Sequence, residues 1–379
     1  LAERRIVLKG VVAAYQVAQT YHLDIIHTQT EFGVGILGKL VARQLKIPVI
    51  HTLHTKYEDY VHYIAKGKIL RPGMVKYIIK SYLFGVDGII VPSAIVLDTV
   101  NRYGVNLEKR VIPTGIELDK FLRPEISAAD CAELRTSLGI LPDETMLLSL
   151  SRIAEEKNIQ SIIKSLVTVR EQIKVKLVIV GSGPYEDKLK RLVKGLALDD
   201  IVIFTGLVDN SQTAYYYKAA DFFISASTSE TQGLTYIESL ASGTPVLAID
   251  NAYLKSLITE PIFGRLFSGD DAIAATILDA ITETPDFDQT HYDQKLYEIS
   301  AENFALRVYE FYLDKIISND QYLAQKGESI PRRTARIVRQ APAKTVKTVV
   351  RTPKKVAYFA KKAIKHAKIL NKYGKIKLK

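Results

Sequence analysis

The sequence has very little cysteine and no apolar segment long enough to cross a membrane. Its single cysteine, Cys131, cannot form a disulfide within the chain, and a lone cysteine suits a reducing compartment. No apolar run approaches the about 20 residues that a spanning helix needs. The first residues, LAERR, also lack the layout of a signal peptide. We therefore expect a chain that folds and acts in the cytoplasm.

Recognisable metal-binding motifs are also missing. The sequence contains no HExxH, no Cys-x-x-Cys and no P-loop. Its acidic pairs, Asp270–Asp271 and Asp286/Asp288, do not follow a strand in an arrangement that would hold a metal-bound diphosphate. We therefore expect no metal requirement and no cofactor.

Acidic residues are absent from the C-terminal tail. Residues 331–379 hold 17 of the 52 lysines and arginines and none of the 41 acidic residues, which leaves 35 basic and 41 acidic residues in the rest of the chain. The tail thus carries +17 and the body about −6. Such asymmetry indicates a tail that acts separately from the folded body.

Read as a helix, residues 353–373 place most lysines away from one modestly apolar face, made of Val356, Phe359, Ala360, Ala363, Ala367 and Leu370. This layout is typical of a helix lying in an anionic membrane surface, where each basic residue contributes roughly 1 kcal/mol. A lysine-rich tail also suits nucleic-acid phosphates, and a solvated tail without a partner is a third interpretation. We favour the membrane and expect no nucleic-acid partner.

In the body, short β-branched runs alternate with helical patterns, which is typical of parallel sheets built from strand–helix–strand units. A first series covers residues 23–28, 48–53, 88–92 and 110–113, and a second covers 146–150, 176–180, 201–205, 221–225, 245–249 and 265–267. The runs are almost continuously apolar, as strands covered on both faces are. The sequence therefore predicts an α/β fold with two Rossmann-like, doubly wound parallel-sheet domains.

The expected domain limits follow from these two series. We place an N-terminal domain at 1–120, a linker at 121–142, a second domain at 143–300, a packed terminal helix at 301–320 and the basic tail at 331–379. The chain opens on a helical pattern over 11–21 instead of a strand with a glycine-rich turn. We therefore expect the N-terminal domain to be truncated at its start.

The most informative segment is SASTSETQGLTYIESLASGTPVLAID, residues 225–250. A strand ends near its beginning, a loop carries Glu230, and a helix that contains Glu238 begins near Gly233, Leu234 and Thr235. Amides at a helix start favour anions, and glycine permits a diphosphate to approach the backbone. The two carboxylates suit sugar and ribose hydroxyls. Solvated glutamates around an ordinary turn are the alternative.

Further polar residues follow other strands. Arg152 and Lys157 come after the run at 146–150 and could neutralise a diphosphate without a metal, or form a surface cation pair with nearby glutamates. Gly181 and Gly183 follow the run at 176–180 but lack the third glycine of a dinucleotide fingerprint, so this signal is weak.

Two histidines of the first domain, His27 and His54, fall at strand ends, where each suits either a sugar or phosphate contact or a structural role. His51 lies within its strand, and we expect it to be packed. The aromatic, charged run that begins at Tyr57 suits either an acceptor entrance or a half-exposed helix.

Together these segments resemble the retaining glycosyltransferases of family 4, whose hallmark is two glutamates separated by seven residues, as Glu230 and Glu238 are. Gly233–Leu234, the SGTPV run at 242–246 and the spacing from Arg152 to Lys157 also fit. The stretches HTQTEFGVG, HTLHTKYEDYVHYIAKG, VIPTGIE and STSETQGLTYIESLASGTP are similar to bacterial diacylglycerol glucosyltransferases. The resemblance covers roughly residues 1–317.

The resemblance implies a GT-B fold, a UDP-sugar donor, UDP-glucose by family habit, and a membrane-lipid acceptor. It also implies a role for each matching position. Arg152 and Lys157 would hold the donor diphosphate, Glu238 would bind the ribose, and Gly181 and Gly183 would also contact the donor. The transferred sugar would be bound by Glu230 together with the amides of Gly233, Leu234 and Thr235, and His54 would contact that sugar or its phosphate. The acceptor would lie near Glu31, Phe32 and Tyr57. The protein would then attach peripherally to the inner face of the plasma membrane. A soluble or polysaccharide acceptor, or an inactive truncated binding relative, are the alternatives.

Overall fold

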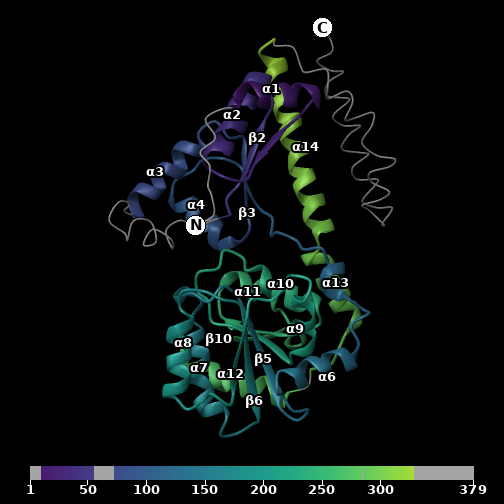
Figure 1. Cartoon of the computed structure of the whole chain (residues 1–379). Coiled ribbons are helices and arrows are strands. Elements are labelled where there is room, and N and C mark those ends of the chain that lie inside the picture. The colour runs from purple at the N-terminus through teal and green to yellow at the C-terminus, as the bar shows by residue number, and fades with distance from the viewer. Residues whose placement is uncertain (1–9, 55–71, 284, 328–379) are drawn as a thin grey trace. The chain divides into compact units, whose positions relative to one another are not determined.

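The computed structural model describes residues 10–54, 72–283 and 285–327, which divide into two compact units. Unit 1 contains the described residues up to Ile112 and those from Ala305 onward, whereas unit 2 is Pro113–Phe304. Both units are parallel-sheet α/β domains, as the sequence predicts (Figure 1). In the described part of the chain, no helix combines the length and apolar character needed to span a bilayer.

The boundaries differ from those placed at residues 120 and 300. The expected linker, 121–142, belongs to unit 2, because its helices α5 (Asp119–Leu122) and α6 (Ala128–Ser137) pack onto that unit. Phe121 contacts the ring of Tyr217 with centroids 6.2 Å apart. The Arg135 guanidinium donates to the carbonyl of Ala219 at 3.2 Å.

Unit 1 is built on a four-stranded parallel sheet in the order β1-β2-β3-β4, with β1 at one edge. Its strands are β1 (Ile26–Thr28), β2 (Val49–Thr52), β3 (Gly88–Val91) and β4 (Lys109–Val111), which confirms the four predicted runs. Its helices are α1 (Val11–Thr20), α2 (Gly33–Leu45), α3 (Pro72–Leu83), α4 (Ala94–Arg102) and most of α14 (Ala301–Gln325).

The predicted terminal helix corresponds to α14, which is longer than expected and packs on unit 1. Phe311 is fully buried against Gly88 of β3, where an added Cβ would come within 2.5 Å of the Phe311 ring. Arg110 of β4 stacks on the same ring at 4.4 Å and pairs with Asp314 at 2.6 Å. The helix therefore completes the fold of the N-terminal unit.

Unit 2 has six parallel strands in the order β10-β9-β8-β5-β6-β7. They are β5 (Thr145–Leu150), β6 (Val175–Val180), β7 (Val202–Gly206), β8 (Phe222–Ser225), β9 (Val246–Ile249) and β10 (Gly264–Phe267), and all six were predicted. The chain order reverses between β5 and β8. In open α/β sheets, ligands bind outside the carboxyl ends of the strands at such a switch point.

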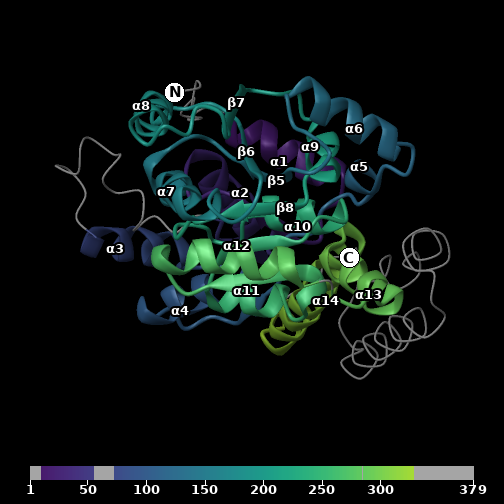
Figure 2. The same ribbon diagram turned by 90° about the horizontal axis from the view of Figure 1, so that it is seen from below.

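Helices cover both faces of this sheet, as Figure 2 shows from below. They are α7 (Ile159–Val169), α8 (Glu186–Gly195), α9 (Thr213–Ala219), α10 (Leu234–Ala241), α11 (Ala252–Leu257), α12 (Ile273–Thr282) and α13 (Gln289–Ile299). Ile224 of β8 belongs to the apolar core under α7, α8 and α12. Its neighbour Phe223 packs between Tyr217 of α9 and Tyr236 of α10, with ring centroids 5.7 and 5.9 Å apart. Successive residues of β8 thus pack against helices on opposite faces of the sheet.

Candidate active site

The segment after β5 brings two cations to the switch point of unit 2. A short 3-10 helix, Glu155–Lys157, follows the strand. Arg152 forms an ion pair with Glu156. Asn158 then takes a left-handed backbone conformation, with φ 51, and its side chain donates to Asp270 at 3.0 Å. The hydrogen bond from Asn158 to Asp270 therefore holds the turn that carries Lys157.

A carboxylate from the loop after β8 meets this segment. The Lys157 ammonium forms an ion pair with Glu230, and the two side chains retain 17% and 24% of their exposure. The Ser227 hydroxyl lies 3.3 Å from the same Glu230 oxygen and 3.4 Å from the Glu156 carbonyl oxygen, and can donate its proton to either. Residues 73 positions apart in the sequence thus gather where a ligand is expected.

Glu238 lies farther along the same loop and helix. Helix α10 begins at Leu234 after Gly233, whose φ of 74 and ψ of 90 favour glycine. The Tyr217 hydroxyl of α9 donates to the Glu238 carboxylate at 3.0 Å. Burial raises the pKa of Glu238, and the hydrogen bond from Tyr217 opposes that shift. Sequence reasoning missed Tyr217, because nothing in the YYY run marks one tyrosine as a partner for a distant carboxylate.

Gly181 and Gly183 follow β6 and have a packing reason to be glycine. An added Cβ would lie 2.0 Å from the carbonyl oxygen of Ser151 at the first position and 2.2 Å from that of Ile153 at the second. The Ile153 amide also donates to the carbonyl of Ser182 at 2.9 Å. The absence of side chains at Gly181 and Gly183 therefore allows the segment that carries Arg152 to pack closely against this turn, which is a structural reason for glycine at both positions.

Gln232 is a second residue that sequence reasoning missed. It is only 4% exposed, and both atoms of its amide bond the backbone of Thr114. The segment PTGIE around Thr114 and the loop before α10 are therefore joined. The sequence did not predict this contact, because Gln232 bonds backbone atoms, which every residue type provides.

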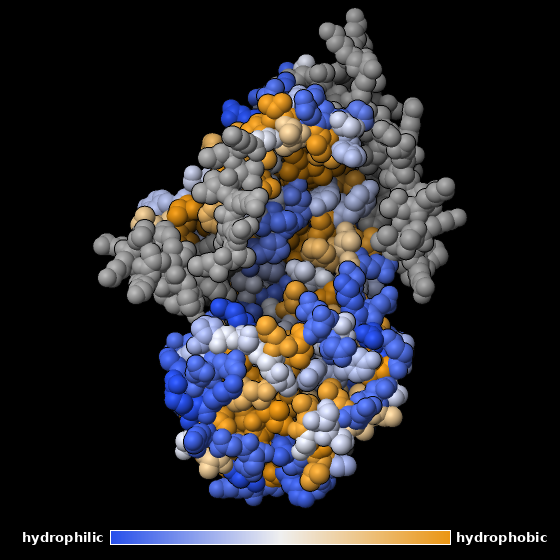
Figure 3. All heavy atoms as spheres, in the orientation of Figure 1, coloured by the Kyte–Doolittle hydropathy of each residue, from blue (hydrophilic) through white to orange (hydrophobic). Residues whose placement is uncertain are grey.

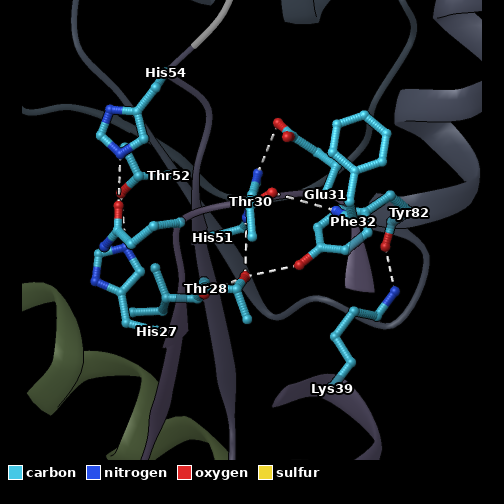
Figure 4. Close-up of polar contacts among 12 residues, drawn as sticks. His27, Thr28, Thr30, Glu31, Phe32, Lys39, His51, Thr52, His54 and Tyr82 are labelled. Carbon is cyan, nitrogen blue, oxygen red and sulfur yellow. Dashed lines mark hydrogen bonds and ion pairs between the residues drawn. The ribbon is translucent and has the colours of Figure 1, made fainter. Parts of the chain in front are cut away.

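In unit 1, polar side chains gather around the carboxyl ends of β1 and β2 (Figure 4). Both ring nitrogens of His27 are engaged, one 2.6 Å from the Tyr312 hydroxyl of α14 and the other 2.6 Å from that of Thr52. Burial, helped by the nearby His51 and His54, lowers the pKa of His27 to about 4. Of the two roles considered for His27, the contacts favour the structural one.

A buried chain of hydrogen bonds lies beside it. His51 is fully buried, as expected, with one nitrogen 2.9 Å from the Thr28 hydroxyl and the other 3.2 Å from Glu31. The Tyr82 hydroxyl donates to Thr28 at 2.9 Å. Glu31, expected near the acceptor, is 7% exposed and faces this chain, whereas the neighbouring Phe32 is 53% exposed. Of this pair, Phe32 offers the accessible side chain.

His54 lies near the carboxyl end of β2; it is open to solvent on one side, while neighbouring atoms shield part of its ring. Its Nε2 lies 2.6 Å from the Gln29 side-chain oxygen, and burial of the ring with His51 nearby lowers its pKa. Its imidazole is therefore neutral at physiological pH and can donate or accept a hydrogen bond. Two further expectations, Tyr57 and the tail at 331–379, lie outside the described residues.

Comparisons with known proteins agree with this fold and these motifs. The sequence matches the family described as Glycosyltransferase Family 4 over residues 2–120 and that described as Glycosyl transferases group 1 over residues 130–295. It is 54% identical to an alpha-monoglucosyldiacylglycerol synthase of Streptococcus pneumoniae, over 95% of this chain and 82% of that protein. It is 31% identical to the enzyme of the same name from Acholeplasma laidlawii, over 80% of this chain and 78% of that protein.

Solved structures share the architecture. Sucrose-phosphate synthase from Thermosynechococcus elongatus superposes with a TM-score of 0.64 and 24% identity, over 80% of this chain and 76% of that one. Anabaena HepE in complex with UDP gives 0.59 and 19%, over 83% and 81%. These similarities show the two-domain GT-B-like fold. With the identity to the pneumococcal protein, they lead to one conclusion: the chain belongs to the family 4 glycosyltransferases.

Proposed function

We propose that this chain transfers glucose from UDP-glucose to diacylglycerol and gives an alpha-linked glucosyl lipid. The relative that is 54% identical is named for making alpha-monoglucosyldiacylglycerol. The observation that carries the proposal is the Lys157–Glu230 ion pair at the switch point of unit 2. A cation and a carboxylate meet there, one suited to a diphosphate and the other to sugar hydroxyls.

In this proposal the donor diphosphate takes the place of carboxylates beside the two cations. Lys157 turns from Glu230 to a phosphate oxygen, and Arg152 from Glu156. Glu230 is then free to accept hydrogen bonds from the sugar, with the Gly233, Leu234 and Thr235 amides close by in sequence. Glu238, held by Tyr217 at 3.0 Å, accepts from the ribose. The Gly181 and Gly183 turn lines the donor side, and His54 contacts the sugar or its phosphate.

Retention of the anomer follows from attack on the face from which the diphosphate leaves. The acceptor oxygen forms its bond to the anomeric carbon as the bond from that carbon to the phosphate oxygen breaks. The departing phosphate oxygen takes the acceptor proton, so that no protein base is needed. The protein mainly stabilises negative charge on the leaving group, which is the largest contribution in many active sites.

Because Arg152 and Lys157 supply two positive charges at this place, the proposal includes no metal ion and no cofactor. Turnover should then survive EDTA, and its loss in EDTA with recovery on adding a divalent cation would contradict this part of the proposal.

The acceptor and the location complete the proposal. We place the enzyme peripherally on the inner face of the plasma membrane, with the basic residues 331–379 on anionic lipid and Phe32 and Tyr57 toward the acceptor. The test is incubation of the full chain with labelled UDP-glucose or UDP-galactose and diacylglycerol in anionic vesicles, followed by lipid analysis. Alpha-glucosyldiacylglycerol is the expected product. Transfer only to a soluble sugar, or donor binding without turnover, would contradict the proposal.

A further inference from the structure

Helix α3 of unit 1 exposes apolar side chains on the face that points away from the core. The exposed fractions are 47% for Met74, 73% for Tyr77, 44% for Ile78 and 85% for Phe84, and we call these four residues the α3 stripe. Met74, Tyr77 and Ile78 recur at the spacing of one helical face, and Phe84 lies in the turn directly after Leu83, the last residue of the helix. The opposite face buries Val75, Ile79, Tyr82 and Leu83 in the core of unit 1. A helix that is apolar on both faces normally has a partner on each.

The C-terminal end of α3, next to Phe84, is held in place by a cation from α2. Lys39 of α2 donates to the carbonyls of Tyr82 and, at 2.8 Å, Phe84, and its ammonium lies 4.7 Å from the centre of the Tyr82 ring. A cation at a helix C-terminus is favourable. Figure 4 shows the contact between Lys39 and Tyr82. The backbone of Phe84 is likewise tied to α2 through Lys39, while the Phe84 side chain is exposed.

The charge around the stripe restricts the kind of partner. Residues 72–86 contain Lys76 and Lys80 and no acidic residue. In Figure 3 hydrophobic surface is visible over α3. A second copy of the same face would bring these lysines against their own counterparts. An anionic bilayer combines negative head groups for the lysines with an apolar layer for the stripe, and tyrosine and phenylalanine suit that boundary.

We propose that the α3 stripe is a membrane-docking surface, with Tyr77 and Phe84 inserted at the boundary between head groups and acyl chains and with Lys76 and Lys80 on anionic phosphates. Its purpose rests on the proposed function, since a membrane-lipid acceptor is reached at the bilayer surface. The surface differs in chemistry from residues 331–379, which offer mostly charge. Attachment by α3 should therefore persist in salt, whereas purely electrostatic attachment is screened.

The experiment uses the full chain and a double variant, Tyr77→Ser with Phe84→Ser. Its matched control is Leu141→Ser with Leu207→Ser, which removes two apolar side chains of unit 2 that are 56% and 78% exposed. Binding to phosphatidylglycerol–phosphatidylcholine vesicles is measured by co-sedimentation in dilute buffer and in about 1 M salt, where the Debye length is about 3 Å. We expect the stripe variant to lose salt-resistant binding about tenfold and the control to match the unsubstituted chain.

Unchanged salt-resistant binding of the stripe variant would overturn the proposal. So would a stripe variant that changes from dimer to monomer in sedimentation while it still binds vesicles, because the face would then join two copies. Transfer to a short-chain diacylglycerol in detergent micelles separates this inference from the proposed function. We expect the stripe variant to retain that activity. Absence of lipid glucosylation by the unsubstituted chain would count against the proposed function, while vesicle binding would still decide the role of α3.

Discussion

The side-chain amide of Gln232 exchanges two hydrogen bonds of 2.8 Å with the backbone of Thr114, one from the Thr114 N–H to the Gln232 oxygen and one from the Gln232 amide nitrogen to the Thr114 carbonyl. Thr114 is the second residue of unit 2, and Gln232 precedes the glycine that caps α10. Two residues after Thr114, Ile116 bonds the backbone around Ser300, accepting from the Ala301 amide at 2.7 Å. The loop before α10 is therefore joined to both ends of unit 2.

Replacement of Gln232 by leucine should destabilise unit 2 and weaken donor binding. It removes the Gln232 partner of the half-buried Thr114 N–H and carbonyl, and a polar group left unpaired costs up to about 1–3 kcal/mol when it is fully buried. We expect a thermal midpoint lower by several degrees and a raised KM for UDP-glucose, because Gly233 loses its support. Gln172→Leu, at an exposed position on the same unit, is the control. An unchanged KM together with a lowered midpoint would show that Gln232 stabilises the fold but does not contribute to donor binding.

Removal of either cation should slow the transfer step. Loss of one group that stabilises the leaving charge typically costs about 3–4 kcal/mol, so Lys157→Ala or Arg152→Ala should lower kcat by roughly 10²–10³. Both side chains are partly exposed, so the fold should persist. The control is Lys164→Ala, on the exposed face of α7. A folded Lys157→Ala variant with full turnover would refute the assignment.

Removal of the Tyr217 hydroxyl should alter the pH dependence of donor binding. The hydrogen bond from Tyr217 lowers the pKa of Glu238 against the larger effect of burial, which raises it. In Tyr217→Phe the pKa of Glu238 should therefore rise further. Since ribose hydroxyls donate to the ionised carboxylate, KM for the donor should begin to rise at a higher pH on acidification, with kcat at neutral pH little changed. Tyr215→Phe serves as control, and identical KM profiles would exclude Glu238 as the ribose contact.

The strands and the residues that follow them could be predicted from the sequence. Buried parallel strands read as continuous apolar runs, and polar residues directly after such runs fall at one edge of the sheet. This is why the sequence could predict that Lys157 and Glu230, which form an ion pair, lie at the same edge of the sheet. Arg152 follows the same strand but pairs with Glu156, one of the nearby glutamates that the sequence offered as an alternative partner. The same reasoning found the helix that carries Glu238, because Gly233 marks its start.

Contacts between distant segments could not be predicted. The bonds of Gln232 with Thr114 span 118 residues, and those of His27 with Tyr312 span 285. Neither pair shows a periodic pattern, since each depends on how helices and loops return to the sheet. For the same reason the sequence did not show that α14 packs on unit 1 or that Glu31 turns inward to His51.

The half-buried His27 predicts a loss of stability in acid. Its pKa is about 4 in the folded protein against 6.5 for an ordinary histidine, mainly because burial disfavours the charged ring. Between these values the unfolded chain binds a proton that the folded chain does not, so the stabilisation is complete above 6.5 and is lost as the pH falls toward 4. The full change amounts to about 3 kcal/mol.

The measurement is the urea midpoint of unit 1 by pulse proteolysis at about pH 7 and about pH 5. The unsubstituted chain should be clearly less stable at the lower pH. In His27→Gln the midpoint at neutral pH should fall, because the bonds to Tyr312 and Thr52 change, but the difference between the two pH values should shrink. His22→Asn is the control, since His22 is exposed with φ 51, a conformation that asparagine tolerates. An equal pH difference in His27→Gln would show that another group takes up the proton.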